Sequence, residues 1–124
     1  MFYPMEVPMQ FLSLLFSVLM IAASSLYAAD AAKGKEVFDK KCAMCHAKDL
    51  KGNPAMAKMY KLDPSALNLV KKETQDKKDA DLIVTTTKGK GKMPAQEGKL
   101  TADDIANAVA YVRSVGSPAG AASK

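Results

Sequence analysis

Two thiols and one imidazole lie close together in the segment Cys42-Ala43-Met44-Cys45-His46. Because two residues separate Cys42 from Cys45, both sulfurs could reach one edge of a porphyrin and form thioethers with its vinyl groups. The adjoining His46 would then offer a ring nitrogen to the iron, and this spacing is typical of c-type haem attachment. Since His46 is the only histidine in the chain, a ligand on the opposite face of the iron cannot be a second imidazole.

Three other interpretations of this segment fit the sequence less well. A structural zinc site takes four Cys or His ligands, and the whole chain offers three. A thioredoxin-like dithiol lies in a βαβ unit, whereas the flanking sequence has a helical pattern. A disulfide between Cys42 and Cys45 would close a very short, strained loop and leave His46 without a role. The segment therefore predicts one haem c, bound covalently.

A glycine-rich loop at residues 88–95 holds a methionine that could bind the same iron. Pro94 restricts the preceding Met93 to extended geometry, so its thioether sulfur could point from the loop toward a flat ring. The alternative is a flexible basic loop with an incidental methionine. Met56 and Met59 lie on a predicted helix, where methionine more often fills gaps in a core. We therefore predict Met93 as the second axial ligand, opposite the imidazole.

Residues 1–28 have the character of a signal peptide. No charged side chain occurs from residue 7 to residue 29, and small residues precede a preferred cleavage site after Ala28. However, the first ten residues contain Glu6 and no Lys or Arg. The uncharged run also approaches the roughly 20 residues that span a bilayer, so an uncleaved anchor in the inner membrane stays open. Both versions predict an exported, periplasmic protein, since c-type haem is attached outside the cytoplasm.

The remaining chain is small and basic. The full chain has a formal net charge of +5 at pH 7, and loss of Glu6 with the leader would make the remaining part more positive. We therefore expect a monomer whose redox partners have acidic docking surfaces. Nucleic acid is a poor candidate, because the lysines are scattered, arginine occurs once and the protein is exported. Residues 117–124 have the composition of a disordered tail.

Two terminal helices are predicted to cross. The first is capped by Asp30 and runs into the haem motif, and the last runs from the cap Thr101 to a stop at Gly116. Gly34 inside the first helix costs about 1 kcal/mol relative to alanine, which suggests that another backbone passes close by. Ala108 on the last helix would allow that approach. The apolar face of the last helix is formed by Ile105, Ala108, Val109, Val112 and Val115.

The middle of the chain is less well defined. Turn residues followed by proline predict two short helices, near 54–61 and 64–72. The charged stretch 71–79 has no apolar face and predicts a solvated loop. Residues 80–87 fit either a strand, from their β-branched run, or a helix, because no partner strand exists.

Residues 31–116 resemble a small bacterial class I c-type cytochrome with one haem. The family's haem motif matches at Cys42, Cys45 and His46, and its methionine loop at Met93-Pro94. Its paired terminal helices match around Gly34 and Phe38 and around Tyr111.

The resemblance implies an all-α cytochrome c domain over residues 29–116. Four or five short helices would enclose the haem, and 80–87 would be helical. It also implies that a proline carbonyl orients the ring of His46. Pro54 is the better match to that proline and Pro64 the weaker one.

With both axial positions held by protein, the iron would exchange single electrons and bind no substrate. The sequence therefore predicts an electron carrier rather than an enzyme. Two alternatives stay open: a haem-based sensor or peroxidase-like enzyme with a displaceable sixth ligand, and a membrane-tethered relay subunit of a respiratory complex. Lysines that flank the haem segments are expected to steer acidic partners, namely Lys48, Lys51, Lys88, Lys90, Lys92 and Lys99.

Overall fold

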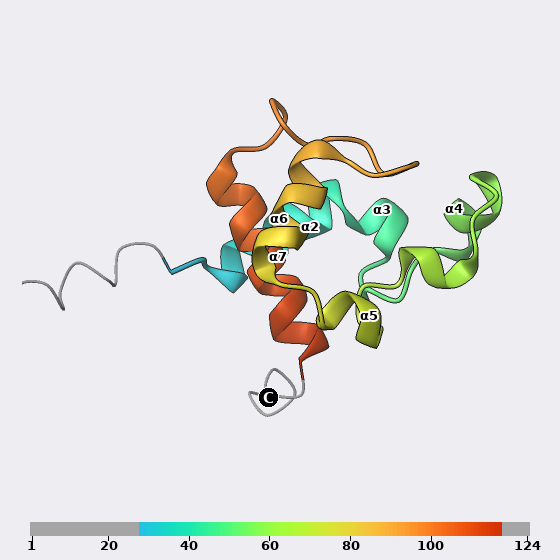
Figure 1. The fold of residues 1–124 in the computed structure, drawn as a ribbon, viewed down its shortest axis with the longest axis horizontal. Coiled ribbons are helices and arrows are strands. Elements are labelled where there is room, and N and C mark those ends of the chain that lie inside the picture. The colour runs from blue at the N-terminus through green and yellow to red at the C-terminus, as the bar shows by residue number, and fades with distance from the viewer. Residues whose placement is uncertain (1–27, 118–124) are drawn as a thin grey trace, which may run out of the picture.

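The computed structural model describes residues 28–117 as helices joined by short loops (Figure 1). Within this range no strand forms apart from isolated bridges at Lys90–Met93 and Glu97–Leu100, so the predicted all-α fold is confirmed. The α-helices are α2 (Ala31–Lys41), α3 (Ala43–His46), α4 (Pro54–Met59), α5 (Lys72–Gln75), α6 (Asp79–Lys88) and α7 (Ala102–Gly116), and η2 (Pro64–Leu67) is a 3-10 helix. The structure has more helices than the four or five predicted, because the haem motif and the charged stretch each form a short helix of their own.

Helices α2 and α7 cross in close contact, as predicted (Figure 1). Gly34 is buried at the crossing, where a Cβ atom would lie 1.8 Å from the carbonyl oxygen of Asn107. The Asn107 side chain also accepts a hydrogen bond of 2.7 Å from the backbone N–H of Asp30. Beyond the crossing, the rings of Phe38 and Tyr111 meet edge to face with centroids 5.4 Å apart. The crossing therefore depends on a residue without a side chain.

The predicted caps of both terminal helices are present. The Asp30 carboxylate accepts from the backbone N–H groups of Ala32 and Lys33. Thr101 and Asp104 form a reciprocal capping box at the start of α7. At the other end α7 includes Gly116, and the helix stops one residue later than predicted.

The predicted apolar face of α7 is buried only in part. Ile105, Ala108, Val109 and Val112 are buried, whereas Val115 is 43 % exposed. Val115 lies in the last turn of α7, one residue before the helix ends.

Between the terminal helices, the predicted helix near 54–61 is confirmed as α4, and 80–87 is helical within α6. The predicted helix near 64–72 begins at Pro64 as expected but is a 3-10 helix that ends at Leu67. The η2 turn stops at Asn68, whose backbone is extended and whose side-chain oxygen accepts from the N–H of Val70. This local hydrogen bond competes with continuation of the helix.

The prediction of a solvated loop over residues 71–79 was also wrong, because this stretch contains α5 and the buried Thr74. This stretch is held in place from α7, the last helix of the chain.

The core is small and centres on Phe38, Leu50 and Ile105, each at most 2 % exposed. Leu50 is buried at a φ of +62°, and its carbonyl accepts a 2.8 Å hydrogen bond from the N–H of Leu69. In the described part of the chain, no helix has the length and apolar character needed to cross a membrane. The predicted leader, apart from Ala28, and the predicted tail, apart from Ser117, lie outside the described residues.

We expect Gly34→Ala to lower the free energy of unfolding of the haem-loaded protein by about 1–3 kcal/mol or more, because the new methyl group would overlap Asn107. Helix propensity alone predicts the opposite sign, a gain of about 1 kcal/mol. Guanidinium unfolding measures the change. Ala32→Gly, on the exposed side of α2, calibrates propensity in the same helix. A Gly34→Ala protein more stable than the parent would contradict the close crossing.

Candidate haem-binding site

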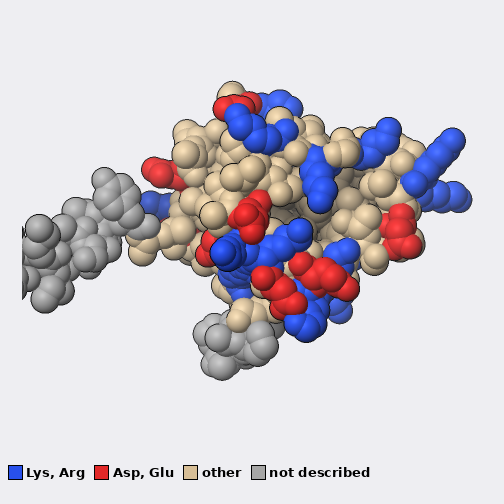
Figure 2. Space-filling model, viewed as in Figure 1, with Lys and Arg blue, Asp and Glu red and all other residues tan. Residues whose placement is uncertain are grey.

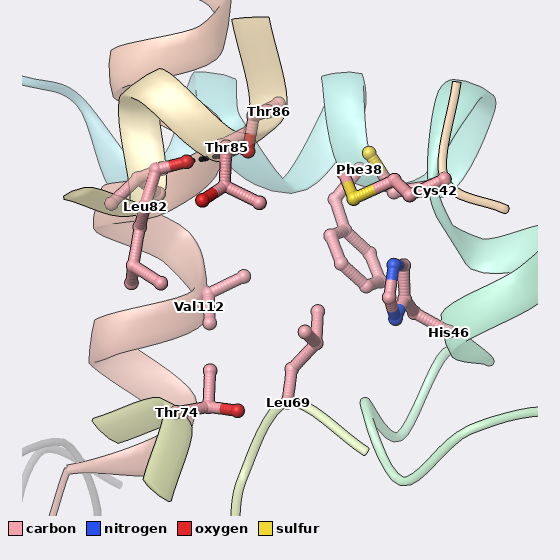
Figure 3. Close-up of a pocket in the computed structure, with 12 residues that line it drawn as sticks. Phe38, Cys42, His46, Leu69, Thr74, Leu82, Thr85, Thr86 and Val112 are labelled. Atoms are coloured by element: carbon pink, nitrogen blue, oxygen red, sulfur yellow. Dashed lines mark hydrogen bonds between the residues drawn. The ribbon is translucent and has the colours of Figure 1, made fainter. Parts of the chain in front are cut away.

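One cavity brings together three of the four predicted site residues. Cys42, His46 and Met93 line one cavity that is partly open to solvent, and Figure 3 shows Cys42 and His46 at its edge. The other lining residues are mostly apolar and come from α2, α5, α6, α7 and the chain before α5, namely Phe38, Leu69, Thr74, Leu82, Thr85, Thr86, Ala108, Val109 and Val112. Cys45, the fourth predicted residue, does not line this cavity.

Helices α2 and α3 place the haem motif at the cavity. Cys42 ends α2, where its N–H donates to the carbonyl of Phe38. One helical turn later the N–H of His46 donates to the carbonyl of Cys42 at 3.0 Å. Because residues four apart share a helix face, both side chains reach the same space. Neither Cys42 nor Cys45 is in a disulfide.

The ring of His46 is oriented by a backbone carbonyl. Its Nδ1 lies 2.8 Å from the carbonyl oxygen of Leu67, so Nδ1 carries the proton and Nε2 keeps its lone pair for a metal. Burial lowers the pKa of His46, against a smaller raising effect of the Leu67 carbonyl. The lowered pKa favours the neutral imidazole that metal binding requires.

The prediction that a proline carbonyl orients the ring of His46 was wrong. Pro54 is the first residue of α4 and Pro64 the first residue of η2, a position that proline favours because it lacks an N–H group. The η2 turn that starts at Pro64 instead carries the carbonyl of Leu67 to the imidazole.

The thiol of Cys42 is held in its neutral form. Burial raises its pKa to about 11, and the nearby Cys45 contributes in the same direction.

Met93 is held by a tight turn. Its N–H donates to the carbonyl of Lys90 at 2.9 Å, and its carbonyl accepts from the N–H of Lys90 at 3.0 Å. Gly89 lies under this turn with φ at +77°, and a Cβ there would come 2.7 Å from the Met93 carbonyl oxygen. Glycine is therefore required at this position both for its backbone angle and for the close contact.

The segment after Met93 is bound to the end of α6. The N–H groups of Gln96 and Glu97 donate to the carbonyls of Thr86 and Thr87, both at 3.1 Å. Lys88 and Glu97 form an ion pair at 2.8 Å across the base of the loop. Backbone hydrogen bonds and one ion pair therefore connect the base of this loop to α6.

Neither of the other two methionines considered above lines the cavity that contains Met93. Met59 is 61 % exposed, so the interpretation as a core residue was wrong for it. Met56 is partly buried on α4.

Comparison with known proteins agrees with this arrangement. Residues 29–112 match the family model described as cytochrome C oxidase, cbb3-type, subunit III. A cytochrome c6 from Rippkaea orientalis is 40 % identical over 105 residues, which cover 82 % of this chain and 85 % of the relative. A cytochrome c6 from Picosynechococcus sp. is 38 % identical over 89 residues, 69 % of this chain and 74 % of the relative. The chain belongs to the c-type cytochromes.

A third relative of this cytochrome is much longer. It is 38 % identical over 89 residues to the cbb3-type cytochrome c oxidase subunit FixP from Bradyrhizobium sp., and the match spans 28 % of that protein. The shared part therefore corresponds to one cytochrome c unit.

Cytochromes of this family are electron carriers with a covalently bound haem c, and this chain has two cysteines, Cys42 and Cys45, for that bond. The structure fits such a group. The cavity lining is mostly apolar, as a macrocycle requires, and α6 has no buried residue of its own. Leu82 and Thr85 of α6 point into the space from one side, and Cys42 and His46 from the other (Figure 3).

Several contributors to this site were missed from the sequence. Leu82 and Thr85 lie three residues apart and share a helix face, but the β-branched run around them obscured the helical period. Thr74 was placed in a solvated loop, since nothing in its charged neighbourhood marks it as buried. The carbonyl of Leu67 carries no side-chain signal, and only the folded chain reveals its role.

We expect Gly89→Ala to destabilise the cytochrome more than Gly98→Ala does. Both glycines have φ at +77°, but only Gly89 has backbone atoms at 2.7 Å from the new methyl group. Each alanine costs about 1–2 kcal/mol for the left-handed backbone, and Gly89→Ala should cost roughly a further 1–3 kcal/mol for the overlap. Denaturant unfolding of the two haem-loaded variants measures the difference. Equal losses would contradict the tight turn at Met93.

Proposed function

We propose that this cytochrome carries single electrons on a haem held by thioethers to Cys42 and Cys45, with His46 and Met93 as the axial iron ligands. The observation that carries the proposal is that Met93 lines the same largely apolar cavity as Cys42 and His46, although it lies far from them in the sequence. The bound haem supplies the Fe(II)/Fe(III) couple.

The protein's own contribution is to orient ligands and exclude water. The carbonyl of Leu67 fixes the tautomer and orientation of His46. The hydrogen-bonded turn at Lys90 and Met93 fixes the backbone from which the Met93 thioether extends. Ligands held by such contacts move little when the charge at the site changes. Thioether ligation and an apolar lining favour the reduced state, so a relatively high potential follows.

This ligation leaves no position for a substrate, and the cytochrome would not act as an enzyme. The ordering of the Met93 loop by Thr86, Thr87 and Lys88 supports a retained sixth ligand over the displaceable one that a sensor or peroxidase needs.

A second candidate is an electron relay within a respiratory oxidase. The observation that favours it is the match to the subunit III family and to FixP. A leader retained as a membrane anchor would suit this version, while a leader cleaved after Ala28 would suit a freely diffusing periplasmic carrier. We favour the freely diffusing periplasmic carrier, because the cytochrome c6 relatives match over most of their own length. Residues 29–116 would then form the cytochrome c domain of a monomer.

Replacing Met93 tests the proposed ligation. We expect the oxidised wild-type cytochrome to show a methionine-to-iron charge-transfer band and to bind carbon monoxide poorly when reduced. Met93→Ala should lose the band completely and bind carbon monoxide readily, because an axial position becomes accessible. Absorption spectra of both redox states measure these changes.

Met44→Ala and Met59→Ala are matched controls, since these methionines are 72 % and 61 % exposed and should leave both spectra unchanged. A band that survives in Met93→Ala, or disappears in either control, would refute Met93 as the ligand.

We further propose that basic side chains near the haem loops attract acidic redox partners. The face seen in Figure 2 carries basic side chains at its upper, right-hand and lower parts, with fewer acidic side chains among them. Lys90 and Lys92 are exposed on the Met93 loop, and Lys48 and Lys51 are exposed after the haem motif. Lys88 is less available than the other lysines because it pairs with Glu97.

A double variant, Lys90→Gln with Lys92→Gln, should lower the rate of electron transfer with an acidic redox protein several-fold at low salt. The difference from wild type should vanish at high ionic strength, because salt screens exposed charges. Stopped-flow kinetics measure the rate. Lys33→Gln with Lys40→Gln removes the same charge from a separate groove between α2 and α7 and serves as the control. If both double variants lost the same fraction of the rate, the effect would come from net charge alone and not from the lysines on the Met93 loop.

A further inference from the structure

The segment between η2 and α6 has weak local support for its structure. Helix α5 has four residues and no side-chain cap at Lys71, and α6 has none at Lys78. In contrast, Asp30, Asn53 and Thr101 cap their helices with side chains. Since an isolated helical turn is unstable in water, α5 needs contacts from elsewhere in the fold.

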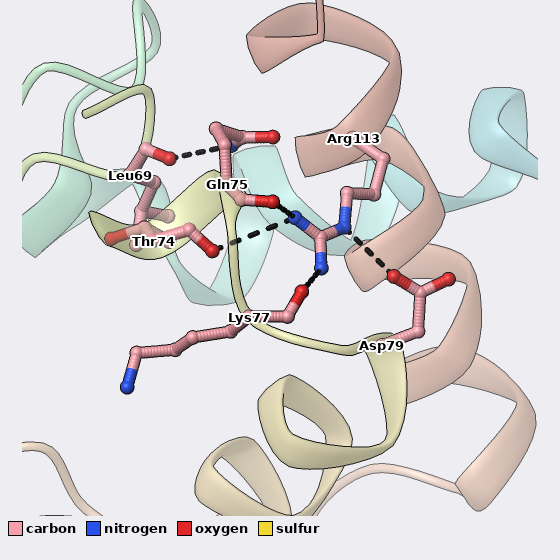
Figure 4. A network of polar contacts seen from close by, with 6 residues as sticks. All are labelled: Leu69, Thr74, Gln75, Lys77, Asp79 and Arg113. Carbon is pink, nitrogen blue, oxygen red and sulfur yellow. Dashed lines mark hydrogen bonds and ion pairs between the residues drawn. The ribbon is translucent and has the colours of Figure 1, made fainter. Parts of the chain in front are cut away.

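Arg113 on α7 supplies those contacts (Figure 4). Its Nη1 donates to the carbonyl of Gln75 at 2.5 Å and, more weakly, to that of Thr74 at 3.5 Å, and its Nη2 donates to the carbonyl of Lys77. Its Nε donates to the carboxylate of Asp79 at 2.7 Å. One guanidinium thus binds the carbonyl of Gln75, the last residue of α5, and the carbonyl of Lys77 just beyond the helix.

Arg113 is the only arginine in a chain otherwise rich in lysine, and its side chain is 20 % exposed. A planar guanidinium can donate in several fixed directions at once, whereas the lysine ammonium is a compact point charge. The arrangement around Arg113 therefore cannot be reproduced by lysine.

The segment held by Arg113 forms part of the haem cavity. Thr74, 9 % exposed, and Leu69 both line it. The Gln75 side chain donates to the Leu69 carbonyl at 2.7 Å. Two residues before Leu69, the carbonyl of Leu67 orients His46. A continuous set of backbone and side-chain contacts thus runs from α7 to the imidazole.

We propose that Arg113 is a positioning residue for the haem site, which holds residues 69–77 against the cavity and so limits water access and keeps the Leu67 carbonyl at His46. The proposal rests on haem binding at His46. Loss of Arg113 would loosen this wall of the cavity without removing any ligand.

Arg113→Lys in the haem-loaded protein tests the proposal. Backbone N–H groups in this segment have hydrogen bonds that slow their exchange, namely those of Thr74, Gln75, Asp76 and Lys77. We expect these amides to exchange at least tenfold faster in the variant, while the amides of α4 stay within twofold of wild type. The reduction potential should fall, because water at the site favours the oxidised state. NMR exchange and redox titration measure the two effects.

Asp79→Asn is the matched control, because it removes the ion pair and leaves the three carbonyl acceptors of Arg113 in place. It should stay close to wild type in both measurements. Arg113→Lys would overturn the proposal if the α5 amides kept their wild-type exchange, if all amides accelerated equally, or if the potential did not change. An Asp79→Asn protein that reproduced the full effect would overturn the role of the carbonyl contacts.

A second variant, Gln75→Met, tests the connection to the cavity with Arg113 intact. It removes the bond to the Leu69 carbonyl and keeps the Gln75 carbonyl that Arg113 binds. We expect a lower reduction potential with little change in the exchange of the α5 amides. An unchanged potential would overturn the proposed connection between Gln75 and the cavity. The proposed ligation is judged separately, because its failure appears as a missing methionine band in the wild type.

Discussion

The close crossing of α2 and α7 is the contact on which the rest of this cytochrome depends. Gly34 lets the two backbones approach at Asn107, and the rings of Phe38 and Tyr111 pack beside the crossing. This pair places Cys42 at the end of one helix and Arg113 on the other. Without it neither the haem motif nor the segment around α5 would be held at the cavity.

Backbone carbonyls, rather than side chains, position most of the site. The carbonyl of Leu67 orients His46, that of Lys90 accepts from Met93, and those of Gln75 and Lys77 bind Arg113. A carbonyl is present at every residue, so its position depends on the path of the chain alone. A small protein with a thin core can thus position His46 and Met93 with few specialised residues.

The family relationship and the geometry contribute different parts of the functional conclusion. The match to cytochromes c6 over most of their length supports an electron carrier. The shared cavity of Cys42, His46 and Met93 supports a particular ligand set for it. The match to oxidase subunits comes from the same unit, since it covers 28 % of FixP. The cytochromes c6 and the FixP subunits therefore share one domain, although the proteins differ in size.

Features that depend on local chemistry can be predicted from the sequence alone. The spacing of Cys42, Cys45 and His46, the Met93-Pro94 pair, the caps Asp30 and Thr101 and the glycine at the helix crossing are all set by neighbouring residues or by one residue type. The tertiary structure decided the rest. The acceptor for His46 proved to be Leu67 instead of a proline, and the charged stretch 71–79 folded because Arg113 binds its carbonyls. These outcomes depend on contacts between residues 21 or more positions apart, and no local pattern encodes which carbonyl will meet which donor.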